Sequence, residues 1–214
     1  MSQDKIPLII GLCGRSGAGK SYVSKIFAEE GIPSVDTDAV YREMTAAPMN
    51  GVLSDCMAEL KNEFGNCILR EDQSLDRRVL ADIVFADNAA DKLKRLNEIT
   101  HRHILTETDR RISEFGKLCF PAVIVDAPLL FESGYDKKCD FIIAATAPDS
   151  VLSARIMKRD GIDFDSAMRR LKVQLSDSEV RSRADFVIET DTDTESLRRC
   201  VREIVNEITD RTKG

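Results

Sequence analysis

The segment "GLCGRSGAGKS", residues 11–21, limits what this chain can fold into more than any other stretch. Gly14, Gly19, Lys20 and Ser21 match the phosphate-loop pattern G-x-x-x-x-G-K-[ST] without a mismatch. A short apolar run precedes the loop, and a helical pattern of apolar residues follows it. Strand, glycine loop and helix in this order form the context that the motif requires. The sequence therefore predicts a loop that holds a chain of phosphates.

Further apolar runs predict the rest of the sheet. After the first run come "PSVDTD", "PAVIVDAP", "DFIIAAT" and "DFVIET", with helical patterns between them. Apolar runs without alternation are typical of strands buried on both faces of a parallel sheet. We expect an α/β fold with a doubly wound, parallel, five-stranded sheet.

Two charged helical segments interrupt this pattern. Residues 44–116 are too long for one crossover helix, so we expect a helical insertion that binds an acceptor substrate. Residues 151–183 are rich in arginine; they are either solvated helices or a lid that closes on phosphates. The nucleotide-binding core would then comprise residues 1–43, 117–150 and 184–214.

The phosphate loop favours a purine triphosphate with Mg²⁺. Backbone N–H groups and the helix N-terminus would face the β-phosphate, Lys20 would neutralise β- and γ-phosphate charge, and the Ser21 hydroxyl would bind Mg²⁺. We expect ATP contacts from Gly14, Gly17, Ala18, Gly19, Lys20, Ser21 and Tyr22. Switch GTPases carry an N-K-x-D segment, which this chain lacks. A small-molecule kinase is the leading class.

Carboxylates follow two of the predicted strands. Asp36 and Asp38 lie at the end of the second strand, where ligands gather in parallel sheets. Asp38 could orient or deprotonate an attacking hydroxyl, or it could cap a helix that begins at Ala39 and pair with Arg42. Asp126 ends the third strand, as the magnesium-associated acid of phosphate-loop proteins does.

An apolar loop, "PLLF", follows Asp126 and is closed by Glu132. It either packs on the insertion or forms a wall for a substrate, through Leu129 among others.

Composition excludes several classes of partner. The chain has 37 acidic and 31 basic residues and a net charge of −6, so no general positive field would collect nucleic acid. Its six cysteines form no metal-binding pattern and indicate reduced thiols. The apolar run near the start is too short to span a membrane. We expect a cytoplasmic protein that binds neither membrane nor nucleic acid, and a monomer, with a homo-oligomer as the alternative.

The later motifs resemble one family. "GLCGRSGAGKS", "VDTDAVYR", "LDRRVLADIVFAD", "LNEITHRHI", "VIVDAPLLFESG", "RIMKRD" and "RADFVIET" occur in the order and at about the spacing seen in dephospho-coenzyme A kinases. The resemblance covers residues 9–197 and implies a P-loop kinase fold with an arginine lid. It implies transfer of the ATP γ-phosphoryl group to the ribose 3′-hydroxyl of dephospho-coenzyme A, the last step of coenzyme A synthesis.

The resemblance also implies roles for single residues. Asp38 matches the catalytic base and Arg42 an arginine of the acceptor site. Arg77 and His101 match insertion positions that face the acceptor nucleotide. Leu129 and Glu132, on the apolar loop, are expected to bind the substrate as well. Arg155 and Arg159 match lid arginines that close on the ATP phosphates, with Lys20 and Arg155 acting in catalysis. Mg²⁺ would be held by Ser21 and, through water, by Asp126.

Several positions depart from the family pattern: Cys13, Arg15, Ala18, Arg102, Val180 and Thr190. None of them removes Lys20, Ser21 or Asp38. Two other functions stay open at this point: a kinase of another small molecule or nucleotide, and an ATP-binding regulatory module. A regulatory module needs neither Asp38 nor the lid arginines, and their joint presence argues against it.

Overall fold

The structure, a computed structural model, describes residues 6–211. Their contacts divide the chain into two compact units. Unit 1 joins the stretch that ends at Asp36 to the stretch that begins at Ile112, and unit 2 is the intervening Thr37–Arg111.

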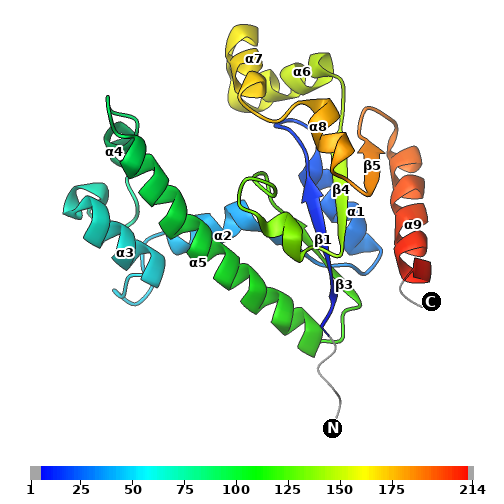
Figure 1. Ribbon diagram of the computed structural model, residues 1–214, viewed down its shortest axis with the longest axis horizontal. Helices are drawn as coiled ribbons and strands as arrows, with labels where there is room; N and C mark the ends of the chain where they lie inside the picture. Colours follow the sequence, from blue (N-terminus) through cyan, green and yellow to red (C-terminus); the bar gives the residue numbers. More distant parts are fainter. Residues whose placement is uncertain (1–5, 212–214) are drawn as a thin grey trace. The chain divides into compact units, whose positions relative to one another are not determined.

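All strands of the described residues lie in unit 1 and form one sheet (Figure 1). They are β1 Leu8–Cys13, β2 Ser34–Asp36, β3 Ala122–Asp126, β4 Phe141–Thr146 and β5 Phe186–Glu189. Their order in the five-stranded sheet is β2-β3-β1-β4-β5, and every neighbouring pair is parallel. The predicted doubly wound parallel sheet is confirmed.

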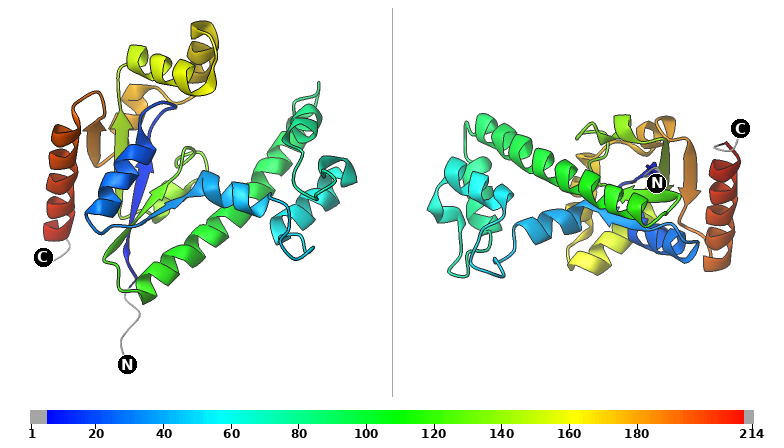
Figure 2. Two further views of the ribbon diagram at one scale, coloured as in Figure 1. Left: turned by 180° about the vertical axis from the view of Figure 1, so that it is seen from behind. Right: turned by 90° about the horizontal axis from the view of Figure 1, so that it is seen from below.

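The sheet is covered on both faces, which explains its unbroken apolar strands. Helices α1 (Lys20–Glu29) and α9 (Thr194–Arg211) share a core with β1, to which Ile10, Leu12 and Phe27 contribute fully buried side chains. Figure 2 shows α1 in front of the sheet when the molecule is seen from behind. On the other face of β1, Leu130 and Cys139 lie directly against Gly11.

Three helices connect β4 to β5: α6 Asp149–Asp160, α7 Phe164–Lys172 and α8 Asp177–Ser182. Local hydrogen bonds define their starts. The Asp163 side chain accepts from the Ser166 N–H at the start of α7, and Ser176 forms a capping box with Glu179 at the start of α8. Helices α6 and α7 pack against each other and reach the core of unit 1 through Ile156 and Leu171.

Unit 2 consists of helices and has its own core. The helices are α2 Thr37–Met44, α3 Asp55–Phe64, α4 Arg77–Val84 and α5 Ala90–Lys117, whose last turns belong to unit 1. Met57, Leu60 and Ile99 are fully buried in this core. Two short 3₁₀ helices complete the chain, η1 Asn66–Ile68 in unit 2 and η2 Tyr135–Lys138 in unit 1.

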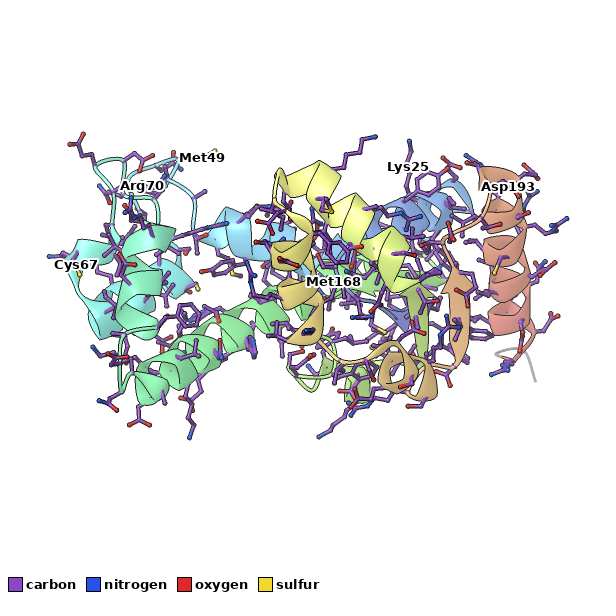
Figure 3. The ribbon with its side chains drawn as sticks, turned by 90° about the horizontal axis from the view of Figure 1, so that it is seen from above. Lys25, Met49, Cys67, Arg70, Met168 and Asp193 are labelled. Carbon is purple, nitrogen blue, oxygen red and sulfur yellow. The ribbon has the colours of Figure 1, made fainter. Side chains whose placement is uncertain are left out.

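Most of the predicted insertion, residues 44–116, falls within unit 2. Helix α2 begins directly after β2 at Thr37, earlier than the Ala39 start considered from the sequence. Figure 3 marks Met49 and Arg70 on exposed loops of unit 2 and Cys67 in η1. Among residues 6–211, no helix is long and apolar enough to cross a membrane.

Candidate active site

The phosphate loop connects β1 to α1 and is tightly enclosed by unit 1. Gly14 and Gly17 have φ angles of 151° and 81°, which favour glycine. A Cβ on Gly14 would come within 2.4 Å of the Ala145 carbonyl oxygen, and one on Gly17 within 2.8 Å of the Leu152 carbonyl oxygen. Only glycine therefore fits at these two positions between the end of β4 and α6.

Lys20 and Ser21 form the first turn of α1. The Lys20 Nζ donates a hydrogen bond to the Gly14 carbonyl oxygen at 3.2 Å, so its ammonium lies across the loop. The N-cap, Gly19, contributes no side-chain hydrogen bond to the helix. The positive end of the α1 dipole therefore lies beside a lysine ammonium, which is an arrangement that binds phosphate.

Oxygen donors suited to Mg²⁺ lie at the carboxyl edge of the sheet. Ser21 is exposed at the start of α1, and Asp126 is buried at the end of β3, where it pairs in register with Leu12 and Asp36. Across the described part of the chain, no group of three or more His, Cys, Asp or Glu is arranged to hold a metal ion. Mg²⁺ bound with a nucleotide needs only one or two protein ligands, because phosphates and water supply the others. The hydroxyl and carboxylate oxygens fit this mode of binding.

Arg155 and Arg159, both on α6, contact the phosphate loop. Arg155 Nη1 donates to the Gly17 carbonyl oxygen at 3.1 Å, and Arg159 Nη2 donates to the Ser16 hydroxyl at 3.2 Å. Arg159 also hydrogen-bonds both carboxylate oxygens of Asp160, at 2.7 and 2.9 Å, and this contact lowers the Asp160 pKa to about 2. The structure thus brings both predicted lid arginines to the loop.

Thr190 follows β5 and links the sheet to Arg155. Arg155 donates to the Thr190 hydroxyl at 2.9 Å and to its carbonyl oxygen at 2.7 Å, while the same hydroxyl donates to the Thr146 carbonyl oxygen at 3.1 Å. Beyond Thr190, the Thr194 hydroxyl accepts a hydrogen bond from the Tyr22 hydroxyl at 3.2 Å. The sequence predicts no contact for Thr190, which is one of the departures from the family pattern, so its place beside Arg155 is a finding of the structure.

Cys13 and Arg15 flank Gly14 and have different surroundings. Burial raises the pKa of the Cys13 thiol to about 12. The nearby Lys20 charge lowers this pKa, but its effect is smaller than that of burial. Cys13 therefore stays a neutral packing residue at the end of β1. Arg15 points toward α6 and α7, where it contacts Asp149 and the Leu171 carbonyl oxygen.

The apolar loop after β3 is divided between core and surface. Leu130 is fully buried in unit 1, whereas Leu129 is 51% exposed and Glu132 is exposed. The Arg183 guanidinium lies 5.1 Å from the centroid of the Phe131 ring, so this loop contacts the segment after α8. Leu129 and Glu132 remain available to a ligand.

Unit 2 brings Arg77 to helix α2. Arg77 is the first residue of α4, which Asp76 caps, and its guanidinium lies 5.5 Å from the centroid of the Tyr41 ring. Tyr41 stands between the predicted residues Asp38 and Arg42, both exposed on α2. Tyr41 therefore holds Arg77 beside α2, the helix that carries the predicted base Asp38.

His101 is half-buried on α5, and its neighbours form an ionic cluster. The Glu59 carboxylate on α3 accepts hydrogen bonds from Arg102 and lies 2.8 Å from His103 Nε2. These contacts, with the Arg102 bond as the largest cause, lower the Glu59 pKa to about 2. Arg102, a departure from the family pattern, thus ties α5 to α3 within unit 2.

The predicted site residues divide between the two units. Unit 1 contains Gly14, Gly17, Ala18, Gly19, Lys20, Ser21, Tyr22, Asp126, Leu129, Glu132, Arg155 and Arg159. Unit 2 contains Asp38, Arg42, Arg77 and His101.

Comparison of the whole chain with known proteins found one matching family. The model of the dephospho-CoA kinase family matches residues 8–196. A dephospho-CoA kinase from Lactobacillus johnsonii is 31% identical over 93% of this chain and 97% of its own, and one from Moorella thermoacetica is 38% identical over 91% and 89%.

Solved structures agree with this fold. A protein from Thermus thermophilus is similar with a TM-score of 0.77 and 31% identity, covering 95% of this chain and 98% of its own. The dephospho-CoA kinase from Campylobacter jejuni shares the fold with a TM-score of 0.59 at 23% identity, covering 95% of this chain and 98% of its own.

Proposed function

The chain belongs to the dephospho-CoA kinase family, and from this membership we propose how its residues transfer the γ-phosphoryl group of ATP to the ribose 3′-hydroxyl of dephospho-CoA. The observation that carries the proposal is the convergence on one loop of Lys20, Arg155 and Arg159. Phosphoryl transfer depends mainly on positioning and on positive charge around the transferred group, and these three side chains supply both.

ATP binds in unit 1 under this proposal. Loop N–H groups from Gly14 to Ser21 hold the phosphates, and Lys20 leaves the Gly14 carbonyl oxygen to neutralise β- and γ-phosphate charge. Residues 151–183 act as the lid, in which Arg159 approaches the phosphates. Tyr22 and Thr190 lie at the nucleoside side of the loop, an assignment supported by the bonds from Tyr22 to Thr194 and from Arg155 to Thr190.

Dephospho-CoA binds through the insertion, residues 44–116, and through α2. Arg42, Arg77 and His101 bind its nucleotide part, and Leu129 and Glu132 line the acceptor at the sheet edge. Arg77 is suited to bind an anionic group because it is exposed and its guanidinium packs on the Tyr41 ring.

Asp38 acts as the base in the chemical step. The 3′-oxygen forms a bond to the γ-phosphorus, the bond from that phosphorus to the β–γ bridging oxygen breaks, and the hydroxyl proton passes to the Asp38 carboxylate. ADP leaves with the electron pair of the broken bond. Asp38 is suited to this role because it is exposed and lies only two residues beyond the end of β2.

The Ser21 hydroxyl and, through water, the Asp126 carboxylate would hold Mg²⁺. When bound, the ion screens the negative charge of the β- and γ-phosphates. We further propose that the protein acts as a monomer in the cytoplasm, without nucleic acid or a membrane as partner. The net charge of −6 supports the absence of nucleic acid.

An acceptor panel tests this function. The purified protein is incubated with Mg-ATP and, in separate reactions, dephospho-CoA, AMP, CMP, adenosine, shikimate or water, while ADP release is followed. We expect dephospho-CoA to give the fastest release and water the slowest. Equal rates with dephospho-CoA and water would contradict the proposal.

A further inference from the structure

Arg15 connects the phosphate loop to both ends of the α6–α7 hairpin. Its Nη1 forms an ion pair with Asp149, the first residue of α6, at 2.5 Å. Its Nη2 donates to the Leu171 carbonyl oxygen, in the last turn of α7, at 3.3 Å. The Arg15 side chain is only 11% exposed, whereas Asp149 is 52% exposed. One guanidinium therefore spans the base of the hairpin.

A second contact reinforces this connection. The backbone N–H of Ser16 donates to the Gln174 side-chain oxygen at 2.9 Å, just beyond the end of α7. Two consecutive residues of the phosphate loop thus bind the same end of α7. The Arg15 bonds to Asp149 and Leu171 cross 134 and 156 positions of sequence, so they fix tertiary rather than local structure.

We propose that Arg15 is a positioning residue for nucleotide binding: it fixes the α6–α7 hairpin on the phosphate loop, so that Arg155 and Arg159 are held ready for ATP. This inference rests on the proposed function, because it assumes that the loop binds ATP. Arg15 itself is directed away from the loop, toward Asp149 and Leu171, and does not contact the reacting atoms in this role.

The positions of the two arginines along α6 explain why Arg15 would affect them. Asp149 begins the helix, Arg155 follows it by more than one and a half turns, and Arg159 follows it by nearly three turns. If the start of α6 and the end of α7 separate from the loop, both arginines lose their fixed distance from Gly17 and Ser16. ATP must then order the hairpin on binding, which weakens its affinity. A loosely held lid also admits water to the γ-phosphate and raises ATP hydrolysis.

Asp149→Ala provides the sharpest test, because two explanations predict opposite signs. If Arg15 acted on ATP only through its charge, removal of the neighbouring carboxylate would tighten ATP binding. If Arg15 positions the hairpin, the same change breaks the ion pair and weakens binding. Asp149 is half exposed, so its replacement should leave the core of unit 1 intact.

The experiment measures the Kd of a magnesium complex of a non-hydrolysable ATP analogue by calorimetry. It compares wild type, Arg15→Ala, Asp149→Ala and the double variant. We expect Kd to rise about tenfold for Arg15→Ala and about threefold for Asp149→Ala, with the double variant no worse than Arg15→Ala. ADP released per phosphorylated acceptor should rise in the same variants.

Arg198→Ala is the matched control, since Arg198 forms an ion pair of the same length, 2.5 Å, with Glu29 elsewhere in unit 1. It should bind the analogue like wild type. Tighter binding by Asp149→Ala, or a Kd for Arg15→Ala within twofold of wild type, would overturn the proposal. If Arg15→Ala does not fold, the Asp149→Ala result decides alone. A wild-type protein that binds the analogue but phosphorylates no dephospho-CoA would contradict the proposed function and leave this binding test valid.

Discussion

The Arg155 guanidinium donates hydrogen bonds to two atoms of Thr190, the hydroxyl oxygen at 2.9 Å and the carbonyl oxygen at 2.7 Å. A third bond from the same group reaches the Gly17 carbonyl oxygen at 3.1 Å. One arginine of α6 thereby joins the phosphate loop to the residue that follows β5. These hydrogen bonds join three segments that are far apart in the sequence: the phosphate loop, α6 and the residue after β5.

Thr190→Val should weaken this assembly. Valine has nearly the same shape as threonine but removes the hydroxyl, so Arg155 loses an acceptor and the Thr146 carbonyl oxygen loses a donor. We expect a loss of about 1 kcal/mol in the free energy of unfolding and a Kd for ATP raised a few fold. Thermal melts and calorimetry measure the two quantities. Thr190→Ser, which keeps the hydroxyl, is the control, and an equal loss in both variants would show that the hydroxyl is unimportant.

Asp38→Asn should separate catalysis from ATP binding. The amide cannot accept the proton of the acceptor hydroxyl, so kcat should fall by roughly 10²- to 10⁴-fold while the Kd for ATP stays within about twofold. Steady-state kinetics and calorimetry provide both values. Glu43→Gln, which alters another exposed carboxylate of α2, should leave kcat near that of wild type. Turnover of Asp38→Asn at the wild-type rate would restrict Asp38 to a structural role at the start of α2.

Tyr41→Leu should impair the acceptor side alone. Leucine packs but cannot attract the Arg77 guanidinium that lies 5.5 Å from the tyrosine ring centroid. The KM for dephospho-CoA should rise by about three- to tenfold with little change in the KM for ATP. Tyr41→Phe keeps the ring and should behave like wild type. An equal rise in both KM values for Tyr41→Leu would speak against a role in holding Arg77.

Acid should remove the stabilisation that Glu59 provides. Its folded-state pKa of about 2 lies below the ordinary value of 4.5, chiefly because Arg102 and His103 hydrogen-bond the ionised carboxylate. A lowered pKa means that the stabilisation is complete above about pH 4.5 and is lost as pH falls toward 2. Melting temperatures measured between pH 6 and pH 2 should therefore fall less steeply for Glu59→Gln than for wild type. The control Glu71→Gln, in an exposed loop, should keep the wild-type slope; a Glu59→Gln curve parallel to wild type would contradict the assignment.

Local sequence patterns were enough to predict the sheet and the loop. Unbroken apolar runs such as residues 122–126 arise because both faces of a parallel strand are buried, and Gly14 is required where a Cβ would strike the Ala145 carbonyl oxygen. The apolar run is local, and Gly14 belongs to a motif of eight consecutive residues, so both are visible in the sequence even though the contact between Gly14 and Ala145 is long-range.

The contacts of Arg15, Gln174 and Thr190 could not be predicted in the same way. Arg15 and Asp149 lie 134 positions apart, and no spacing rule connects a loop arginine to the start of a distant helix. Thr190 was noted from the sequence only as a departure from the pattern that the resemblance implies, and only the structure shows that its hydroxyl lies between Arg155 and the Thr146 carbonyl oxygen. The start of α2 at Thr37 was also missed, because the chain passes from strand to helix without an intervening turn.

Identification of the reaction product is the most direct test of the central claim. The purified protein is incubated with Mg-ATP and dephospho-CoA, and the product is analysed by mass spectrometry and phosphorus NMR. We expect one ADP for each acceptor that gains a phosphoryl group, with the new phosphate on the ribose 3′-oxygen. An acceptor of unchanged mass, or a phosphate attached at another position, would contradict it.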